Sequence, residues 1–209
     1  MLLVFAVESG HWRCGNTVSL FCVPRLVEGD LMAELIIKEH KSSSYAPRTY
    51  HNASVADFTM ALAVDHNTAG EKCTQKAAGD KIIKLEFAYE WVDNARLLYH
   101  ALKKGSHKAL NVAGNGIYTF DKYNITQEHL NEIVFQMLDT VHYHYGIDKI
   151  YCGGQTGADL AGAVAAYKIG IDCEIMFPKG FKMRFQDGKD VDTSEEFVRK
   201  LVTDYAAML

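Results

Sequence analysis

The sequence predicts an α/β fold in which a mostly parallel sheet carries helices on both faces. Two observations indicate this class. Segments with strand and helix character alternate five times from residue 55 onward, which is the pattern of parallel strands joined by helical crossovers. The chain also has 209 residues, enough for one large domain with a sizeable hydrophobic core.

Strands and helices alternate clearly in the first half of this region. Val55–Val64 and Lys81–Phe87 carry apolar residues at the alternating positions typical of strands. Thr68–Ala78 and Val92–Lys104 have helical spacing, and each is followed by a glycine. The second helix has two lysines in its last turn, where the helix dipole favours cations.

The second half repeats the alternation. Short apolar runs predict strands at Leu110–Ala113, Lys149–Cys152 and Cys173–Phe177. Helices are predicted over Thr126–Tyr143, over Leu160–Ile169, and after a capping box at Thr193–Glu196. Because the carboxyl ends of parallel strands meet at one edge of a sheet, we expect the loops after the five strands to converge on one crevice. Open α/β sheets bind their ligands at that edge.

The N-terminal part of the chain is less regular. Residues 1–31 match no clear period. Residues 38–52 are polar, contain three consecutive serines and a proline, and predict a loop. We therefore assign residues 1–44 to an N-terminal extension and residues 45–209 to a single domain.

Composition narrows the class of protein. The apolar content of 48% and the charged content of 23% are ordinary for a soluble globular protein. The net charge is −4 and the chain has no polybasic run, whereas proteins that bind nucleic acid or anionic membranes usually present a basic face. We therefore expect neither a membrane nor a nucleic-acid partner.

The cysteines and the first residues indicate the compartment. The five cysteines form no Cys-x-x-Cys pair, so neither a disulfide framework nor a zinc ribbon is predicted. Met1–Val7 is apolar, but it lacks a positively charged start and Glu8 interrupts it. It is too short to span a bilayer and is unlike a signal peptide. We expect a cytoplasmic protein with reduced thiols.

One glycine-rich string is the main candidate for a binding site. It stands between a predicted strand and a predicted helix, so its backbone N–H groups and the positive helix end suit a phosphate or another oxyanion. The alternative is a plain strand-to-helix turn. The candidate ligand-binding residues in it are Gly153, Gly154, Gln155, Thr156, Gly157 and Asp159.

Other loops at the same predicted edge supply further candidates. Gly114, Asn115 and Gly116 follow the next strand, where a simple turn is the alternative. Thr68 and Gly70 open a helix after Val64, and the same helix start offers N–H groups to an anion. The cations of Lys179 and Arg48 are candidates for contact with a phosphate.

Catalytic residues are less clearly indicated. Hydrolysis needs a carboxylate within hydrogen-bond reach of the attacking water. Asp159 is the candidate we name first, and Asp57 and Glu71 are the alternatives. The nine histidines are scattered, and we predict no metal site.

These strings resemble a known family. The segment Gly153–Asp159, a helix of small residues, a short strand, Phe177–Gly180 and then Asp187–Gly188 are similar to the molybdenum carrier family. That family belongs to the Rossmann-like nucleotide-binding superfamily (SLOG) that includes DprA and the LOG-type phosphoribohydrolases. The resemblance implies a Rossmann-like, DprA/LOG-like domain with a nucleotide or a molybdopterin-type cofactor as its ligand.

The rest of the family's pattern is present in a different order. Segments similar to its Y..RT, S-D-x-T, G-T-x-L-T and L-N-V-A-G strings all precede Gly153, at residues 45–49, 56–59, 68–74 and 110–114. We infer a circular permutation, which a fold tolerates when its termini lie close together. The resemblance covers roughly residues 45–190. Because the third string departs from the family's pattern, the identity of the cofactor does not follow from it.

Three functions stay open. The first is binding of a nucleotide-like or phosphate- or oxyanion-bearing small ligand, for sensing, carriage or sequestration. The second is a nucleotide-processing hydrolase such as an N-glycosidase, although the Pro-Gly-Gly-x-Gly-Thr-x-x-Glu string of the phosphoribohydrolases is absent. The third is carriage of the molybdenum cofactor. The resemblance also implies a homo-oligomer, formed through Thr126–Tyr143 or Phe197–Met208 unless their apolar faces belong to the core.

Overall fold

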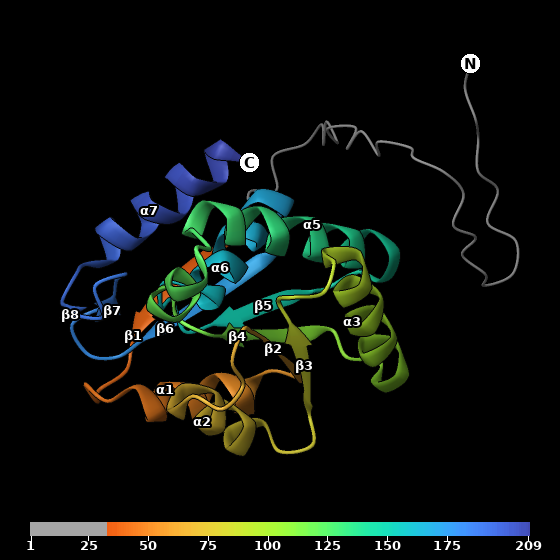
Figure 1. Ribbon diagram of the computed structural model, residues 1–209, viewed down its shortest axis with the longest axis horizontal. Helices are drawn as coiled ribbons and strands as arrows, with labels where there is room; N and C mark the ends of the chain where they lie inside the picture. The colour runs from red at the N-terminus through yellow and green to blue at the C-terminus, as the bar shows by residue number, and fades with distance from the viewer. Residues whose placement is uncertain (1–32) are drawn as a thin grey trace, which may run out of the picture. The chain divides into compact units, whose positions relative to one another are not determined.

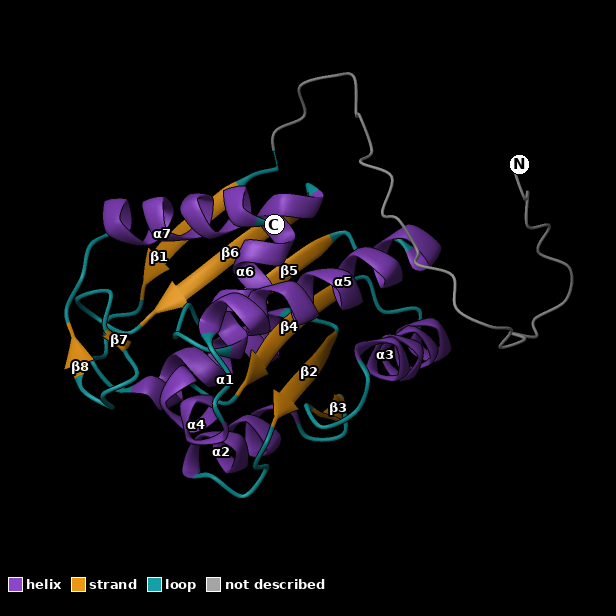
Figure 2. Ribbon diagram, turned by 45° about the horizontal axis from the view of Figure 1, so that its top comes forward, coloured by secondary structure: helices purple, strands orange, loops and turns teal. Residues whose placement is uncertain are grey.

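A single parallel sheet organises the computed structural model, which describes residues 33–209. Its six strands lie in the order β1-β6-β5-β4-β2-β3, and every neighbouring pair is parallel. Helices cover both faces of the sheet (Figures 1 and 2). The prediction of a Rossmann-like α/β fold with a parallel sheet is therefore confirmed.

The strands are short and all belong to this sheet except the last two. The six are β1 (Leu35–Glu39), β2 (Phe58–Ala63), β3 (Ile82–Glu86), β4 (Ala109–Gly114), β5 (Lys149–Cys152) and β6 (Asp172–Phe177). A separate antiparallel hairpin consists of β7 (Met183–Arg184) and β8 (Asp190–Val191).

The helices divide between the two faces of the sheet. The longer ones are α1 (Tyr45–Val55), α2 (Ala69–Ala78), α3 (Trp91–Gly105), α5 (Gln127–Tyr145), α6 (Ala158–Ile169) and α7 (Glu195–Met208). A short α4 (Ile117–Phe120) and a 3₁₀ turn (Asp121–Tyr123) follow β4. Helices α1 and α2 lie side by side under one face, and α6 lies on the other with α5 and α7 packed against it (Figure 1).

The start of the described region differs from the prediction in two respects. Strand β1 pairs with β6, so the sheet already includes residues that we assigned to the extension 1–44. The loop predicted over residues 38–52 is wrong for most of its length, because α1 begins at Tyr45. Pro47 lies in the first turn of α1, where its missing N–H has no helical partner to lose. The irregular segment 1–31 lies outside the described residues.

Helix α6 is buried almost completely and lies at the centre of its layer. Small residues allow it to approach the sheet closely: a Cβ on Gly162 would lie 2.5 Å from Cγ1 of Val112 in β4. A helix that is apolar on all sides belongs in a core rather than on a surface. Its position explains why the glycine string, which leads into α6, is held against the sheet.

The apolar stripe of α5 is part of the core. Leu130, Val134, Met137 and Leu138 are buried within the protomer, because α5 packs on α6 and α3. On α7, Val198 and Val202 are buried as well. The predicted oligomer surface on α5 is therefore used inside the fold, whereas Phe197 and Met208 at the two ends of α7 are exposed. None of the helices in residues 33–209 combines the length and hydropathy needed to cross a membrane.

The path of the chain sends the loops of some neighbouring strands to opposite faces at the carboxyl edge. From β1 to β3 the crossovers run through α1 and α2 on one face, and from β3 to β6 they return through α3, α5 and α6 on the other. The neighbours β2 and β4 therefore send their following loops to opposite faces. Such a switch point is the usual position of a ligand crevice in an open α/β sheet.

Candidate functional site

The carboxyl end of β5 is joined to α6 by the glycine string, and an acidic side chain lies at its centre. Nη1 of Arg48 donates to Oδ2 of Asp159 at 2.9 Å, and both side chains are less than one-tenth exposed. The backbone N–H groups of Gly153 and Gln155 also donate to the Asp159 carboxylate. Burial raises the pKa of Asp159, whereas Arg48 and the two amides oppose that shift. Asp159 therefore occupies the position at which the string would hold an external oxyanion.

Other polar groups of the string are also bonded inside the protein. The Gly157 N–H donates to Oε1 of Gln127 at 2.6 Å, and the Ala158 N–H donates to the Asn115 carbonyl at 3.1 Å. The Thr156 hydroxyl donates to the carbonyl of Arg184. These bonds fix the start of α6 to α5, to the loop after β4 and to the β7–β8 hairpin.

The glycines of the string make room for protein side chains and backbone. A Cβ on Gly153 would lie 1.0 Å from Nη1 of Arg48, and one on Gly154 would lie 2.1 Å from the Phe177 ring. Gly157 has φ 103° and would place a Cβ 2.3 Å from the Asn115 carbonyl oxygen. In the structure the close approach that these glycines permit is therefore an approach of the protein to itself, and their contact with a ligand stays a prediction.

The loops after β4 and β5 lie together, as the sequence predicted. Gly116 forms a β-bridge with Gly157, and a Cβ on Gly114 would lie 2.7 Å from the Ala158 side chain. Asn115 spans the switch point between β4 and β2. Its Oδ1 accepts from the N–H groups of Val64 and Asp65, both at 3.0 Å.

A second polar cluster lies at the start of α2. Nδ2 of Asn115 donates to Oε1 of Glu71 at 3.3 Å, while Oε2 of Glu71 is buried without a hydrogen-bond partner. Nδ1 of His66 lies 3.8 Å from Glu71, and Nε2 lies 3.5 Å from Glu86. Both ring nitrogens of His66 are buried and make no hydrogen bond. Burial, followed by the charge of Asp159, raises the pKa of Glu71 to about 7.

A third cluster lies beside the glycine string and is partly exposed. Nε and Nη2 of Arg184 lie 2.7 and 3.2 Å from the two carboxylate oxygens of Asp190, and the Tyr45 hydroxyl donates to Asp190 at 2.8 Å. The guanidinium of Arg184 lies 5.5 Å from the ring centroids of Tyr45 and of Tyr118. The guanidinium of Arg48 lies 5.6 Å from the Tyr45 ring. Two arginines and two tyrosines thus gather at the carboxyl edge.

The remaining predicted site residues lie in less enclosed positions. Thr68 caps α2 by accepting from the Glu71 N–H at 3.2 Å, and Gly70 is exposed. The Lys179 side chain is exposed, and its N–H donates to the Ser42 carbonyl. Asp57 accepts from backbone groups at the start of β4, which is the opposite edge of the sheet. The hypothesis that Asp57 belongs to the site is therefore wrong.

Sequence reasoning named some members of the clusters and missed others. It singled out Arg48, Asp159 and Asn115, but it gave no role to Tyr45, Tyr118, His66 or Asp190. A lone tyrosine or aspartate carries no local signal of its distant partners. The one available hint was the resemblance of residues 45–49 to a family string.

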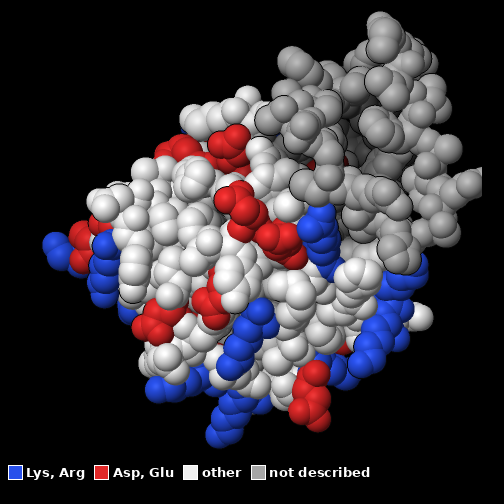
Figure 3. All heavy atoms as spheres, turned by 45° about the vertical axis from the view of Figure 1, so that its right-hand side comes forward, with Lys and Arg blue, Asp and Glu red and all other residues white. Residues whose placement is uncertain are grey.

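The distribution of surface charge and of possible metal ligands can be compared with the sequence prediction. Over most of the described surface on the face shown in Figure 3, basic and acidic side chains are interspersed, and a few basic side chains lie together at its lower right. In residues 33–209 no group of three or more His, Cys, Asp or Glu side chains is arranged to hold a metal ion.

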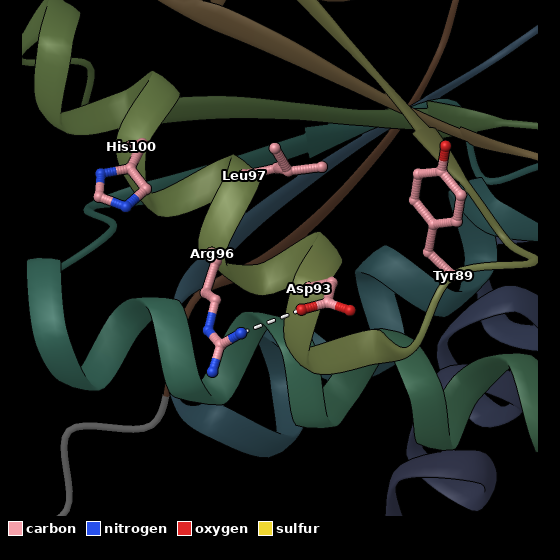
Figure 4. A pocket seen from close by; sticks show the side chains of 5 residues that line it. All are labelled: Tyr89, Asp93, Arg96, Leu97 and His100. Atoms are coloured by element: carbon pink, nitrogen blue, oxygen red, sulfur yellow. Dashed lines mark hydrogen bonds and ion pairs between the residues drawn. The ribbon is translucent and has the colours of Figure 1, made fainter. Parts of the chain in front are cut away.

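An open hollow of about 370 Å³ lies on the outer side of α3 (Figure 4). It is lined by Tyr89, Asp93, Arg96, Leu97 and His100. Nη1 of Arg96 pairs with Oδ1 of Asp93 at 3.1 Å at its rim. Because that ion pair is half exposed and no buried polar group faces the hollow, we assign it no part in the site.

Comparisons with protein-family models, with curated proteins and with solved structures found no match for this chain. The resemblance to the molybdenum carrier family and the circular permutation therefore stay predictions from the sequence.

Proposed function

We propose that this protein binds a small phosphate-bearing or nucleotide-like ligand at the carboxyl edge of the sheet, for sensing, carriage or sequestration. One observation carries the proposal. Arg48 and Arg184 both pack against the Tyr45 ring, beside the glycine string and close to the switch point of the sheet. A guanidinium offers a planar fork of N–H donors that matches phosphate, and tyrosine faces provide apolar surface for a ring.

The two arginines differ in what they offer a ligand. Arg48 is buried and its charge is balanced by Asp159. Arg184 is also paired, with Asp190, but it is about one-third exposed and lies 5.5 Å from the ring centroids of both Tyr45 and Tyr118. Arg184 is therefore the residue that meets the phosphate, while Arg48 holds the loop and adds positive potential behind it. A molybdopterin-type cofactor is one ligand of this chemical class.

The test is titration calorimetry with AMP, ADP and inorganic phosphate on wild type and matched arginine variants. Arg184→Ala removes a fork donor and is expected to weaken binding by about tenfold or more, corresponding to about 1.4 kcal/mol. Arg96→Ala is the control, because Arg96 is also exposed and paired with an aspartate. Equal affinity of the two variants for every compound, or no binding of any compound to wild type, contradicts the proposal.

A hydrolase acting on a nucleotide is the second candidate, and Glu71 is the observation that favours it. Its pKa is raised to about 7 and its Oε2 has no hydrogen-bond partner, which suits a group that takes up and releases a proton near neutral pH. Asp159, the first candidate from the sequence, is held by Arg48 and two amides instead.

Incubation with a nucleotide panel, followed by chromatography for released base, separates the two functions. A hydrolase releases base, and Glu71→Gln abolishes the release while the protein remains folded. A pure binding protein returns every nucleotide unchanged. Sedimentation velocity on the same preparation tests the proposed homo-oligomer, which predicts a mass above 23.4 kDa.

A further inference from the structure

The carboxylate of Asp190 is held by a donor set that resembles an anion-binding site. Nε and Nη2 of Arg184 face its two oxygens at 2.7 and 3.2 Å, and the Tyr45 hydroxyl donates at 2.8 Å to the oxygen nearer Nε. This two-pronged arrangement of guanidinium on carboxylate is the same one that binds two oxygens of a phosphate.

The donors are fixed by the body of the domain rather than by Asp190. The N–H of Arg184 donates to Oε1 of Gln155 at 2.9 Å, and its carbonyl accepts from the Thr156 hydroxyl. Its guanidinium lies 5.5 Å from the ring centroids of both Tyr45 and Tyr118. Residues of the glycine string and of two helix starts thus hold the donors in place. Removal of Asp190 therefore leaves the donor set assembled.

The Asp190 side chain is accessible from solvent. Asp190 pairs with Arg184 across the two-residue strands of the β7–β8 hairpin, and about one-third of its side chain is exposed. The hydrogen bond to Arg184 lowers the pKa of Asp190. Burial, and then Asp190, raise the pKa of Tyr45 to about 12. The carboxyl group is therefore charged and the phenol is a donor at neutral pH, as an anion site requires.

We propose that Arg184 and Tyr45 form the phosphate site of this protein and that Asp190 is an internal anion which the ligand's phosphate displaces. The Asp190 side chain then acts as a latch that closes the site when no ligand is bound, while the backbone of the β7–β8 hairpin, which also carries Arg184, stays in place. This inference rests on the proposed function and adds to it the group that is recognised and the contact that limits affinity. Because part of the binding free energy is used to undock Asp190, removing that side chain strengthens binding.

The test compares inorganic phosphate and AMP binding by calorimetry in four proteins. They are wild type, Asp190→Ala, Asp187→Ala, and Asp190→Ala combined with Arg184→Ala. Asp187 lies in the turn of the same hairpin and pairs with Lys189 at 3.6 Å, so its variant removes the same charge without vacating the site. Asp190→Asn, which preserves size, is the second variant if the alanine variant melts early.

The proposal predicts that Asp190→Ala binds phosphate about tenfold more tightly than wild type and Asp187→Ala, a gain equivalent to about 1.4 kcal/mol. The double variant loses that gain. Equal affinities of Asp190→Ala and Asp187→Ala overturn the latch. If AMP still binds wild type and Arg184→Ala still weakens it, that result leaves the proposed function standing. If neither compound binds wild type or Asp190→Ala, the proposed function falls together with the latch.

Discussion

Helices α6 and α2 both begin at the carboxyl edge of the sheet, and the two starts are built differently. At α6, the amides of Gly153, Gln155 and Gly157 donate to protein side chains. At α2, Thr68 caps one amide, and Glu71 and His66 retain buried polar atoms without hydrogen-bond partners. The backbone amides of the first start therefore have partners inside the protein, although Nε of Arg48 beside them is buried without one. At the second start, a carboxylate oxygen and both nitrogens of an imidazole ring are left without hydrogen bonds.

This difference shows what can be inferred from a glycine-rich string in a sequence. Glycine allows any close approach, whether of a phosphate or of the protein's own groups. At α6 the approaching groups are Arg48, Asp159 and the loop after β4. The groups best placed to bind a ligand or transfer a proton therefore lie beside the string. They are Arg184 and Tyr45 on one side and Glu71 on the other, rather than the backbone of the string itself.

The largest expected change in the free energy of unfolding comes from substituting the glycines at the starts of these two helices. Gly157→Ala forces a residue with φ 103° and a contact of 2.3 Å with the Asn115 carbonyl, and we expect a loss of about 2–6 kcal/mol. Gly70→Ala meets nothing closer than 3.9 Å and is expected to gain about 0.5–1 kcal/mol. Urea unfolding measures both. Similar stabilities of the two variants would show that the starts of α6 and α2 do not differ in how tightly they are packed.

The buried ion pair at α6 is the next test. Asp159→Ala leaves the Arg48 guanidinium buried without its partner, and we expect the free energy of unfolding to fall by about 3–5 kcal/mol. Asp93→Ala removes an exposed pair with Arg96 and is expected to cost about 1 kcal/mol or less. A cost for Asp159→Ala no larger than that of the control shows that the string does not depend on its internal anion.

At the start of α2, the contribution of Glu71 to the free energy of unfolding depends on pH. The pKa of Glu71 is raised from 4.5 to about 7, so the folded state holds a proton that the unfolded state releases between these values. Wild type therefore loses stability as pH rises through this window, by about 3 kcal/mol at most. Glu71→Gln cannot release a proton there.

We expect Glu71→Gln to match wild type near pH 4 and to exceed its stability at about pH 8. Thermal melts across the range measure this difference. Glu195→Gln, at an exposed position of α7, is the control, because it makes the same chemical change outside the α2 cluster. A constant difference between Glu71→Gln and wild type over the whole range would refute the raised pKa.

The smallest effect concerns the cap of α2. The Thr68 hydroxyl accepts from the Glu71 N–H, and the Thr126 hydroxyl does the same for the His129 N–H in α5. Each Thr→Ala change is expected to lower the free energy of unfolding by about 1 kcal/mol. A much larger loss at Thr68 than at Thr126 would indicate that the cap also orders the Glu71 and His66 cluster.

Local pattern was sufficient for much of the fold. The strand predicted at Lys149–Cys152 has the observed bounds, and the helices predicted from Thr68 and Thr126 begin one residue later, with each threonine as the cap. Helix α1 was missed because its buried residues are Arg48 and Asn52, so no apolar stripe marks it. Strand β1 was missed because it is a five-residue run next to a polar segment.

The sequence predicted where in the fold the site lies, but it did not predict which side chains contact one another there. The convergence of the loops after β4 and β5 followed from parallel topology alone. The pairing of Arg48 with Asp159 joins residues 111 positions apart, and that of Tyr45 with Asp190 joins residues 145 apart. Such pairs depend on how the whole chain packs, which no local spacing reveals.

Amide NMR of ¹⁵N-labelled protein during titration with AMP tests the central claim most directly. The account predicts that the largest shifts fall on the start of α1 around Tyr45, on the start of α4 around Tyr118 and on the β7–β8 hairpin, and that Arg184→Ala suppresses them. Shifts confined to the hollow on α3, or an unchanged spectrum in excess AMP, would contradict it.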